Sequence, residues 1–287
     1  GAVEELDPEG ESMEQDQHRK AKIFAALHAG PETFVIPNPW DVGSTRILAG
    51  MGFQALATTS AGYAFSRGRP DGTIGRDEML GHAAEIVTAT ELPVSADLEH
   101  GYGDAPEEAG ETIRLAAGVG LVGASIEDFS GGRDGSIYDF ALAVERIEAA
   151  VAAARKQDFP FFLTARAENF IRGRPDLDDT IKRLVAFEAA GADVLYAPGL
   201  PDLEAIATVC QALEKPVNVV MGLTGSGLTT AQLAAAGVRR ISLGAVLART
   251  ALGAFMAAAE EIAAGGYSFI DGAASFGDIS AHMRGAD

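Results

Sequence analysis

The feature that most constrains this chain is a regular alternation along its length. From Phe34 onward, short segments rich in β-branched residues alternate with longer segments rich in alanine, leucine and glutamate at helical spacing. This alternation is typical of repeated β-α units around a parallel sheet. We predict strands over residues 34–37, 55–59, 93–97, 123–127, 161–166, 194–197, 217–221 and 240–243. Eight such units predict an α/β fold of the (β/α)8 TIM-barrel type.

The two ends of the chain differ from this repeating middle. Residues 1–15 are rich in acidic side chains, and Met13 suits a native start, so we interpret 1–15 as a disordered lead or an expression remnant. Residues 16–287 then form one barrel domain with a C-terminal helical extension. We predict an alanine-rich helix over 246–264, followed by an apolar tail. The apolar side chains of such a tail must be buried, either against its own barrel or against a partner subunit.

Composition excludes several classes of function. The 41 acidic and 22 basic residues give a net charge of −19, which disfavours binding to nucleic acids and to anionic membranes. We see no secretion signal and no apolar run of the roughly 18 residues that a membrane span needs, so we expect a cytoplasmic protein. Cys210 is the one cysteine, which rules out an internal disulfide or a thiolate cluster. Any metal is therefore expected to have oxygen or imidazole ligands.

Polar side chains gather at the carboxyl ends of the predicted strands, where a TIM barrel places its active site. These candidates are Ser60, Ala61, Gly62 and Asp71 after the second strand, Asp97, Glu99 and His100 at the third, Glu127 at the fourth, Arg166 at the fifth and Asn218 in the seventh. By contrast, the five lysines fall in predicted helices or just before a strand. A Schiff-base mechanism inside the barrel is therefore not expected.

Three of the candidate side chains predict a metal site. Asp97 and Glu99 are two residues apart, so on an extended strand they point the same way, and Glu127 comes from the adjacent strand. Three carboxylates so close together would repel one another without a cation. Oxygen ligands of this kind suit Mg²⁺, or Mn²⁺, with several waters retained. The alternative is that these acids cap helices or pair with basic residues at the surface.

The remaining candidates predict substrate contacts. The planar guanidinium of Arg166 suits a carboxylate or an enolate oxygen near the metal, unless it forms a structural ion pair with Glu127 or Glu168. Backbone N–H groups of residues 60–62 could bind a carboxylate, unless they belong to an ordinary tight turn. His100 is a candidate acid or base. We expect the other histidines, His18, His28, His82 and His282, at the surface.

An ordered set of motifs resembles a known family. The motifs are Asn38-Pro39-Trp40-Asp41, Gly43-Ser44-Thr45-Arg46, Thr59-Ser60-Ala61-Gly62, Gly68-Arg69-Pro70-Asp71, Asp97-Leu98-Glu99-His100-Gly101-Tyr102-Gly103, Ile126-Glu127-Asp128 and Ala165-Arg166-Ala167-Glu168. Together they resemble the isocitrate lyase/phosphoenolpyruvate mutase superfamily, in the branch of carboxyvinyl-carboxyphosphonate phosphorylmutase and 2-methylisocitrate lyase. The likeness runs in order over residues 23–255.

The resemblance implies a barrel whose eighth helix is exchanged between subunits, giving a homodimer or homotetramer. It also implies a Mg²⁺ site for a 2-oxo acid or its enolate. In that arrangement Asp97, Glu99 and Glu127 hold the metal directly or through water, and Asp71 supports the metal shell. Arg166 then faces the substrate oxygens, while residues 60–62 bind the substrate carboxylate.

Some positions depart from the family pattern. The loop at 129–136 lacks the Lys-Lys-Cys-Gly-His type motif of the lyases, whose cysteine is the general acid, and also the lysine, threonine and asparagine of the mutase gate. Pro198 replaces a glutamate at the sixth strand, and Thr58 replaces a tyrosine.

The half of the mechanism that these departures leave intact is stabilisation of a pyruvate-like enolate by a metal and Arg166. We therefore predict a Mg²⁺-dependent lyase that cleaves a C–C bond in a small 2-oxo or 2-hydroxy acid resembling oxaloacetate, isocitrate or an alkylmalate. One alternative is C–P bond chemistry of the phosphoenolpyruvate mutase or phosphonopyruvate hydrolase type. A second is a non-catalytic protein that binds a 2-oxo acid.

Overall fold

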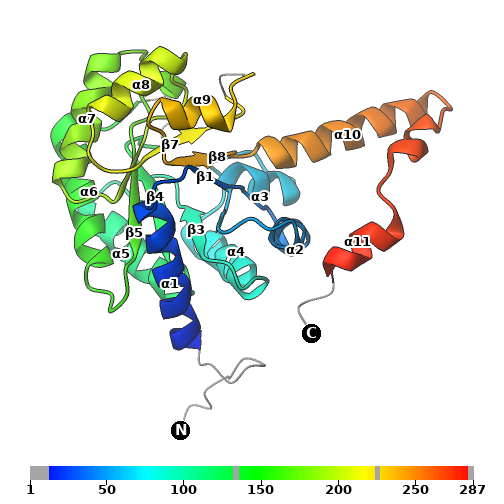
Figure 1. Cartoon of the computed structure of the whole chain (residues 1–287), viewed down its shortest axis with the longest axis horizontal. Coiled ribbons are helices and arrows are strands. Elements are labelled where there is room, and N and C mark those ends of the chain that lie inside the picture. The colour runs from blue at the N-terminus through cyan, green and yellow to red at the C-terminus, as the bar shows by residue number, and fades with distance from the viewer. Residues whose placement is uncertain (1–12, 132–135, 224–226, 284–287) are drawn as a thin grey trace, which may run out of the picture.

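A barrel of parallel strands is the centre of the computed structural model, which describes residues 13–131, 136–223 and 227–283 (Figure 1). The strands are β1 (Phe34–Ile36), β2 (Leu56–Ala57), β3 (Val94–Asp97), β4 (Gly123–Glu127), β5 (Phe162–Arg166), β6 (Val194–Tyr196), β7 (Val217–Val220) and β8 (Arg240–Ser242). Their order in the sheet is β1-β8-β7-β6-β5-β4-β3-β2, and every pair is parallel. At the seam between β1 and β2, the Ala57 N–H donates to the Pro37 carbonyl at 3.1 Å. The predicted TIM-barrel fold is confirmed.

Most of the helices surround this barrel on the outside. The main ones are α1 (Met13–Ala29), α2 (Val42–Gly50), α3 (Ser60–Ser66), α4 (Arg76–Thr88), α5 (Pro106–Gly118), α6 (Phe140–Ala154), α7 (Leu177–Ala189), α8 (Leu203–Gln211), α9 (Thr230–Ala235), α10 (Val246–Ala263) and α11 (Phe276–Met283), with 3-10 turns η1 (Phe170–Arg172) and η2 (Ser268–Gly272). Within the described ranges, no helix is long and apolar enough to cross a bilayer. Of the predicted lead, residues 1–12 lie outside the described ranges. Residues 13–15 form the first turn of α1 instead of a disordered segment.

Helix α1 closes the amino-terminal end of the barrel. Phe24 is fully buried in a small cluster with the first residues of β1, and its neighbour His28 is only 5% exposed. The His28 ring stacks on Phe162, with ring centroids 4.6 Å apart. The expectation of a surface position is therefore wrong for His28. The reason is that the face of α1 that carries His28 packs against the amino-terminal end of the barrel.

The same expectation is wrong for His82 on α4. Its side chain is buried, and its ring stacks on that of Tyr63 with centroids 3.8 Å apart. Burial lowers the pKa of His82 to about 4, which keeps the ring neutral. Helical spacing alone does not say which histidines lie on the covered face of a helix.

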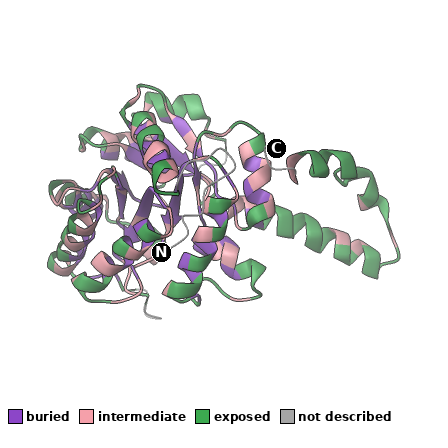
Figure 2. Ribbon diagram, turned by 90° about the horizontal axis from the view of Figure 1, so that it is seen from below, coloured by how far each residue is buried: buried purple, intermediate pink, exposed green. Residues whose placement is uncertain are grey.

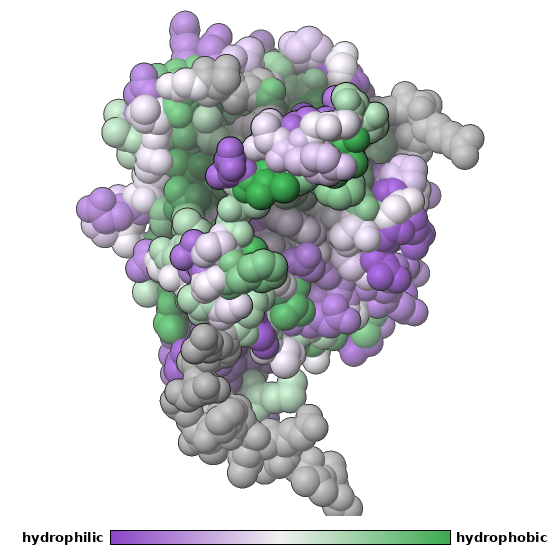
Figure 3. All heavy atoms as spheres, turned by 90° about the vertical axis from the view of Figure 1, so that its right-hand side faces the viewer, coloured by the Kyte–Doolittle hydropathy of each residue, from purple (hydrophilic) through white to green (hydrophobic). Residues whose placement is uncertain are grey.

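The last elements of the chain form an arm that leaves the barrel. Helix α10 matches the predicted helix at 246–264 and projects outward, and Figure 2 shows most of the arm as exposed. Phe276 is 92% exposed, and Phe255 and Met256 are also exposed on α10. From the side of the arm, green apolar surface lies among purple polar residues (Figure 3). Helix α11 returns to α2, where an Arg46 Nη1–H donates to the Met283 carbonyl at 2.8 Å. Part of the apolar tail thus remains uncovered in the single chain.

Candidate active site

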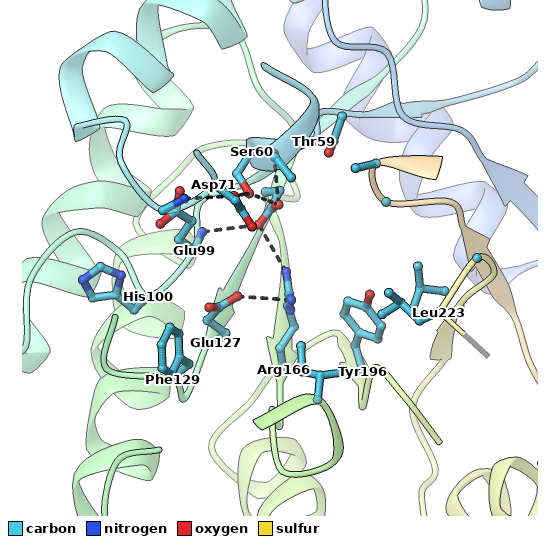
Figure 4. Close-up of a pocket in the computed structure, with 18 of the residues that line it drawn as sticks. Thr59, Ser60, Asp71, Glu99, His100, Glu127, Phe129, Arg166, Tyr196 and Leu223 are labelled. Atoms are coloured by element: carbon cyan, nitrogen blue, oxygen red, sulfur yellow. Dashed lines mark hydrogen bonds and ion pairs between the residues drawn. The ribbon is translucent and has the colours of Figure 1, made fainter. Parts of the chain in front are cut away.

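A cavity of about 770 Å³ opens at the carboxyl ends of the strands. Eight of the predicted site residues line it: Ser60, Ala61, Asp71, Asp97, Glu99, His100, Glu127 and Arg166. In Figure 4, Glu127 and His100 lie on one side of Arg166, and Tyr196 and Leu223 lie on the other. The cavity therefore has an acidic side and a less polar side.

Asp97 occupies the centre of the acidic side. One of its oxygens, Oδ2, accepts hydrogen bonds from the Ser60 hydroxyl at 2.7 Å and from the Ser60 N–H at 3.2 Å. The other oxygen, Oδ1, is 3.2 Å from Arg166 Nη1. Asp71 reaches the same group from the loop after α3, because its Oδ1 lies 3.4 Å from the Ser60 hydroxyl. Burial and the neighbouring Asp97 carboxylate raise the pKa of Asp71.

Glu99 stands on a turn of unusual backbone geometry directly after β3. Its φ is +49° and that of Tyr102 is +62°, a left-handed region that non-glycine residues seldom adopt. The Glu99 Oε1 atom is buried and has no hydrogen-bond partner in the described part of the chain. Burial, together with Asp97 and Asp71, raises the pKa of Glu99 to about 8. A carboxylate in this position is chemically ready for a cation.

Arg166, at the end of β5, joins the acids of the site into one network. Its guanidinium lies 2.8 Å from the fully buried Glu168 and 3.2 Å from Glu127. Arg172, on η1, lies 3.2 Å from Glu168 and 3.6 Å from Glu127, so the two arginines share the same two acids. Even so, burial and the Glu168 charge raise the pKa of Glu127 well above its usual range. The structural ion pairs weighed for Arg166 thus exist, and its guanidinium also faces the cavity.

His100 borders the cavity next to Glu99. Its Nδ1 atom is buried and has no hydrogen-bond partner among the described residues. Burial and the nearby Arg146 guanidinium lower the pKa of His100, which favours the neutral ring. A neutral imidazole with a free nitrogen can accept or pass on a proton.

The opposite wall of the cavity is largely aliphatic. It is built by Val220 from β7, by Leu243 after β8 and by Val246 at the start of α10, with Leu223 above them. Arg249, one turn further along α10, also lines this side, and among the described residues its guanidinium has no ion-pair partner. This wall suits a carbon group of a ligand, and its edge suits an anionic group.

Two predicted site residues do not line this cavity. Gly62 lies in the first turn of α3, where its N–H donates to the Thr59 hydroxyl at 3.2 Å. Asn218 is the second residue of β7, so it lies deeper in the barrel, where it contacts Ser242 and Arg240. Asn218 lies two residues before the carboxyl end of β7, and this position is the physical reason why it does not reach the cavity.

The comparisons with known proteins agree with this geometry. A family model described as phosphoenolpyruvate phosphomutase matches residues 24–263. This match spans most of the barrel and includes every residue of the acidic side. The chain belongs to the isocitrate lyase/phosphoenolpyruvate mutase superfamily. The predicted resemblance is confirmed, and the chain is thereby placed among enzymes.

Several members of the superfamily are similar to this chain over most of its length. A solved structure from Burkholderia cenocepacia J2315, whose description stops at lyase/mutase, is 57% identical, with a TM-score of 0.92, and covers 95% of this chain and 98% of its own. The uncharacterised protein Rv1998c of Mycobacterium tuberculosis is 34% identical over 78% of this chain and 82% of its own. An oxaloacetate decarboxylase of Chromohalobacter salexigens is 28% identical over 78% of each.

Members of the superfamily generally depend on a divalent metal, usually Mg²⁺, and the acidic side of this cavity fits such an ion. The unpartnered Glu99 oxygen and the cavity-facing Asp97 and Glu127 supply carboxylate donors. In the described ranges, three acidic or histidine ligand atoms lie within 4.8 Å of one another only at Glu14, His18 and Asp158, on the outer surface. The three predicted ligands are therefore too far apart to bind one ion directly together. A hydrated Mg²⁺, held partly through water, suits that spacing.

Sequence reasoning missed three residues of this superfamily site. Tyr196 ends β6, and its ring lies under the Arg166 guanidinium at 5.0 Å. The strand-end rule would have found Tyr196 if it had been applied to the sixth strand. Arg172 was missed because η1 comes after the strand end, although its spacing of four residues from Glu168 was visible. Glu168 itself appeared only as the last residue of a family motif and as a possible ion-pair partner of Arg166.

Proposed function

We propose that this protein is a Mg²⁺-dependent lyase that cleaves a C–C bond in a small 2-oxo or 2-hydroxy carboxylic acid. A 2-oxo acid would react through a pyruvate enolate, and a 2-hydroxy acid through the enolate of the departing carboxylate fragment. The observation that carries the proposal is the Arg166 guanidinium, which faces the cavity beside Asp97 and Glu127. An enolate oxygen develops negative charge as the bond breaks. A guanidinium held in advance at that position stabilises the charge without further reorganisation.

The substrate carboxylate would bind at the start of α3. Of the backbone N–H groups at residues 60–62, that of Ser60 is engaged by Asp97 and that of Gly62 by Thr59. Ala61 therefore offers the N–H for this role, because the Ser60 hydroxyl already donates to Asp97. When bound at Asp97, Glu99 and Glu127, Mg²⁺ would supply Lewis-acid stabilisation of the substrate oxygens. Asp71 would orient Ser60 and support the metal shell.

His100 would act as the general base or the proton donor of the reaction. Its side chain lines the same cavity as Glu99, its Nδ1 has no hydrogen-bond partner among the described residues, and its lowered pKa keeps the ring neutral and thus available as a base. A retro-aldol cleavage of a 2-hydroxy acid needs a base at the hydroxyl group. Decarboxylation of an oxaloacetate-like acid needs a proton donor to the enolate afterwards. A single histidine on this side could serve either reaction.

C–P bond chemistry is the second candidate, and it is supported by the description of the matching family model. A phosphonate group needs several hydrogen-bond donors around it. The aliphatic wall at Val220, Leu243 and Val246 supplies none from its side chains, and Arg249 at the edge of this wall supplies a single guanidinium. This wall favours a carbon leaving group over a phosphonate.

The arm supports a homodimer or a homotetramer formed by exchange of helix α10 between subunits. Exposed aromatic and aliphatic side chains along α10 and after it, such as Phe255, Met256 and Phe276, would lose favourable burial in a monomer. A second subunit offers the same kind of barrel surface on which they could pack. Sedimentation velocity of the wild type and of a Phe255→Asp variant tests this assembly, since the variant should shift toward monomer.

The test of the lyase proposal measures the release of pyruvate, or of glyoxylate in the case of isocitrate, with Mg²⁺ and with excess chelator. The panel contains oxaloacetate, isocitrate, methylisocitrate, dimethylmalate and phosphonopyruvate. Metal-dependent release from one of the first four supports C–C cleavage, and release from phosphonopyruvate alone supports the second candidate. No turnover, with 2-oxo acid binding retained, would favour the non-catalytic alternative.

A further inference from the structure

A second, smaller cavity lies inside the barrel, below the floor of the active site. It has a volume of about 60 Å³, enough for more than one water molecule or a small ion. Its lining is unusually polar for a barrel interior, which branched aliphatic side chains normally fill. The polar lining residues are Asn38, Thr58, Ser95, Asp97, Ser125, Arg166, Tyr196, Asn218, Arg240 and Ser242. We call this cavity the inner chamber.

Arg240 is the dominant group of the inner chamber, and it is 5% exposed. Its Nε–H donates to the Asn218 amide oxygen at 2.8 Å, and an Nη2–H donates to the Thr164 hydroxyl at 2.9 Å. Its Nη1 lies 3.3 Å from His28 Nε2. In the described ranges no aspartate or glutamate forms an ion pair with Arg240. The guanidinium is thus buried among neutral partners.

His28 does not change this balance of charge. Its Nδ1 lies 2.8 Å from the Phe24 carbonyl, so Nδ1–H donates there and Nε2 is left as an acceptor for Arg240. Burial, and then the Arg240 charge, lower the pKa of His28 to about 3. The ring is neutral at physiological pH and contributes no negative charge. A buried arginine without an acid is costly, since buried charges are normally paired.

Further hydrogen-bond donors face the inner chamber without a partner. The hydroxyl groups of Ser95 and Ser125 line it, and within the described ranges neither has a hydrogen-bond partner. Asp97, the one acid that borders the chamber, directs its two oxygens to Ser60 and Arg166 at the active site. The chamber therefore presents a cation and free hydroxyl groups, and no free carboxylate oxygen.

We propose that the inner chamber binds a small monovalent inorganic anion of halide size beside Arg240. The ion would balance the buried guanidinium and accept hydrogen bonds from Ser95 and Ser125. Water alone would hydrate these groups but would leave the positive charge without a counterion in a low-dielectric interior. The site is separate from the proposed carboxylate site at residues 60–62, and it stabilises the fold without taking part in bond cleavage.

Diffraction from crystals of wild-type protein purified and grown in sodium bromide tests the proposal directly. Bromide scatters anomalously, so a bound ion is distinguished from water at the same place. We expect an anomalous peak in the inner chamber within hydrogen-bond distance of the Arg240 guanidinium. Ordered water there without an anomalous signal, or a peak only at Arg249 in the outer cavity, would overturn the proposal.

Thermal unfolding gives an independent measurement. At equal ionic strength, sodium bromide at about five times its Kd should raise the Tm of the wild type above that in sodium gluconate by about 2–4 °C. Arg240→Gln should abolish this difference, and the control Arg249→Gln should keep it. An equal bromide response in Arg240→Gln would overturn the proposal. If Arg240→Gln does not fold, the diffraction experiment on the wild type decides.

Discussion

Arg166 and Arg240 project into the same barrel and meet opposite surroundings. Arg166, at the carboxyl end of β5, lies within 3.2 Å of three acids, namely Asp97, Glu127 and Glu168. Arg240, at the start of β8, has only neutral partners among the described residues. The first site has an excess of negative charge and the second has an excess of positive charge.

Titration of the neighbouring groups follows the same division. At the carboxyl ends of the strands, which form the mouth of the barrel, burial and the neighbouring acids raise the pKa values of Glu99 and Glu127. In the interior, burial and Arg240 lower the pKa of His28, so a proton is excluded. One barrel can therefore select cations at the carboxyl ends of its strands and anions in its interior, because these two regions differ in charge.

The largest expected contrast is in catalysis. Arg166→Lys keeps a positive charge but loses the planar fork that bridges the acids and the substrate, so turnover should fall about 10³-fold, or about 4 kcal/mol of transition-state stabilisation. Arg240→Gln should leave kcat within a few-fold of the wild type, provided that it folds. Both variants are measured on the substrate found by pyruvate release. Equal losses in the two variants would contradict the division of roles.

The next contrast is in stability against pH. The folded-state pKa of His28 is about 3, below its unfolded value of 6.5. As pH falls below 6.5, the unfolded chain therefore takes up a proton first, and stability decreases by up to roughly 1.4 kcal/mol per pH unit toward pH 3. Urea unfolding between pH 7 and pH 5 should show a shallower decrease for His28→Gln. Parallel curves would mean that His28 is not held neutral.

The stabilisation by Mg²⁺ should depend on the acids at the carboxyl ends of the strands and not on acids elsewhere. At a concentration about 100 times its Kd, Mg²⁺ should stabilise the wild type by about 2.7 kcal/mol. Glu127→Ala should remove this rise in Tm, whereas Glu145→Ala, an exposed acid on α6, should keep it. An unchanged response in Glu127→Ala would count against the metal assignment.

The smallest expected effect concerns the proton that Mg²⁺ displaces from the Glu99 carboxyl group. Since the pKa of Glu99 is about 8, its carboxyl group is mostly protonated at pH 7, and Mg²⁺ must displace that proton. Apparent Mg²⁺ affinity should therefore rise by up to about tenfold per pH unit below pH 8 and level off above it. Calorimetry in buffers of different ionisation enthalpy reports the proton directly. In Glu99→Gln the buffer dependence should disappear, while affinity falls.

The sequence predicted the mouth of the barrel better than its interior. Asp97, Glu127 and Arg166 end neighbouring strands, and parallel strands bring their carboxyl ends together, so their convergence follows from position alone. The interior depends on which side chains point inward below the ends. Arg240 looks like an ordinary strand residue in the sequence, and only the register of β7 with β8 shows that it lies beside Asn218, which was expected at the active site.

Helical faces were a second source of error. His28 and His82 lie in helices whose apolar spacing is weak, so nothing local indicated which face is covered. Their burial is decided by tertiary contacts, with the barrel end for His28 and with Tyr63 for His82. Arg172 similarly belongs to the site only because η1 folds back over Glu127 and Glu168.

The short seam at β1 and β2 has a consequence for local opening. Strand β2 has two residues, whereas β4 and β5 pair over five positions. Amide hydrogens near Ala57 should therefore exchange with solvent sooner than those of β4, through opening that leaves most of the barrel folded. Ser60, three residues after the end of β2, is hydrogen-bonded to Asp97. Brief separation of this seam would thus free the carboxylate-binding edge to admit and release small molecules.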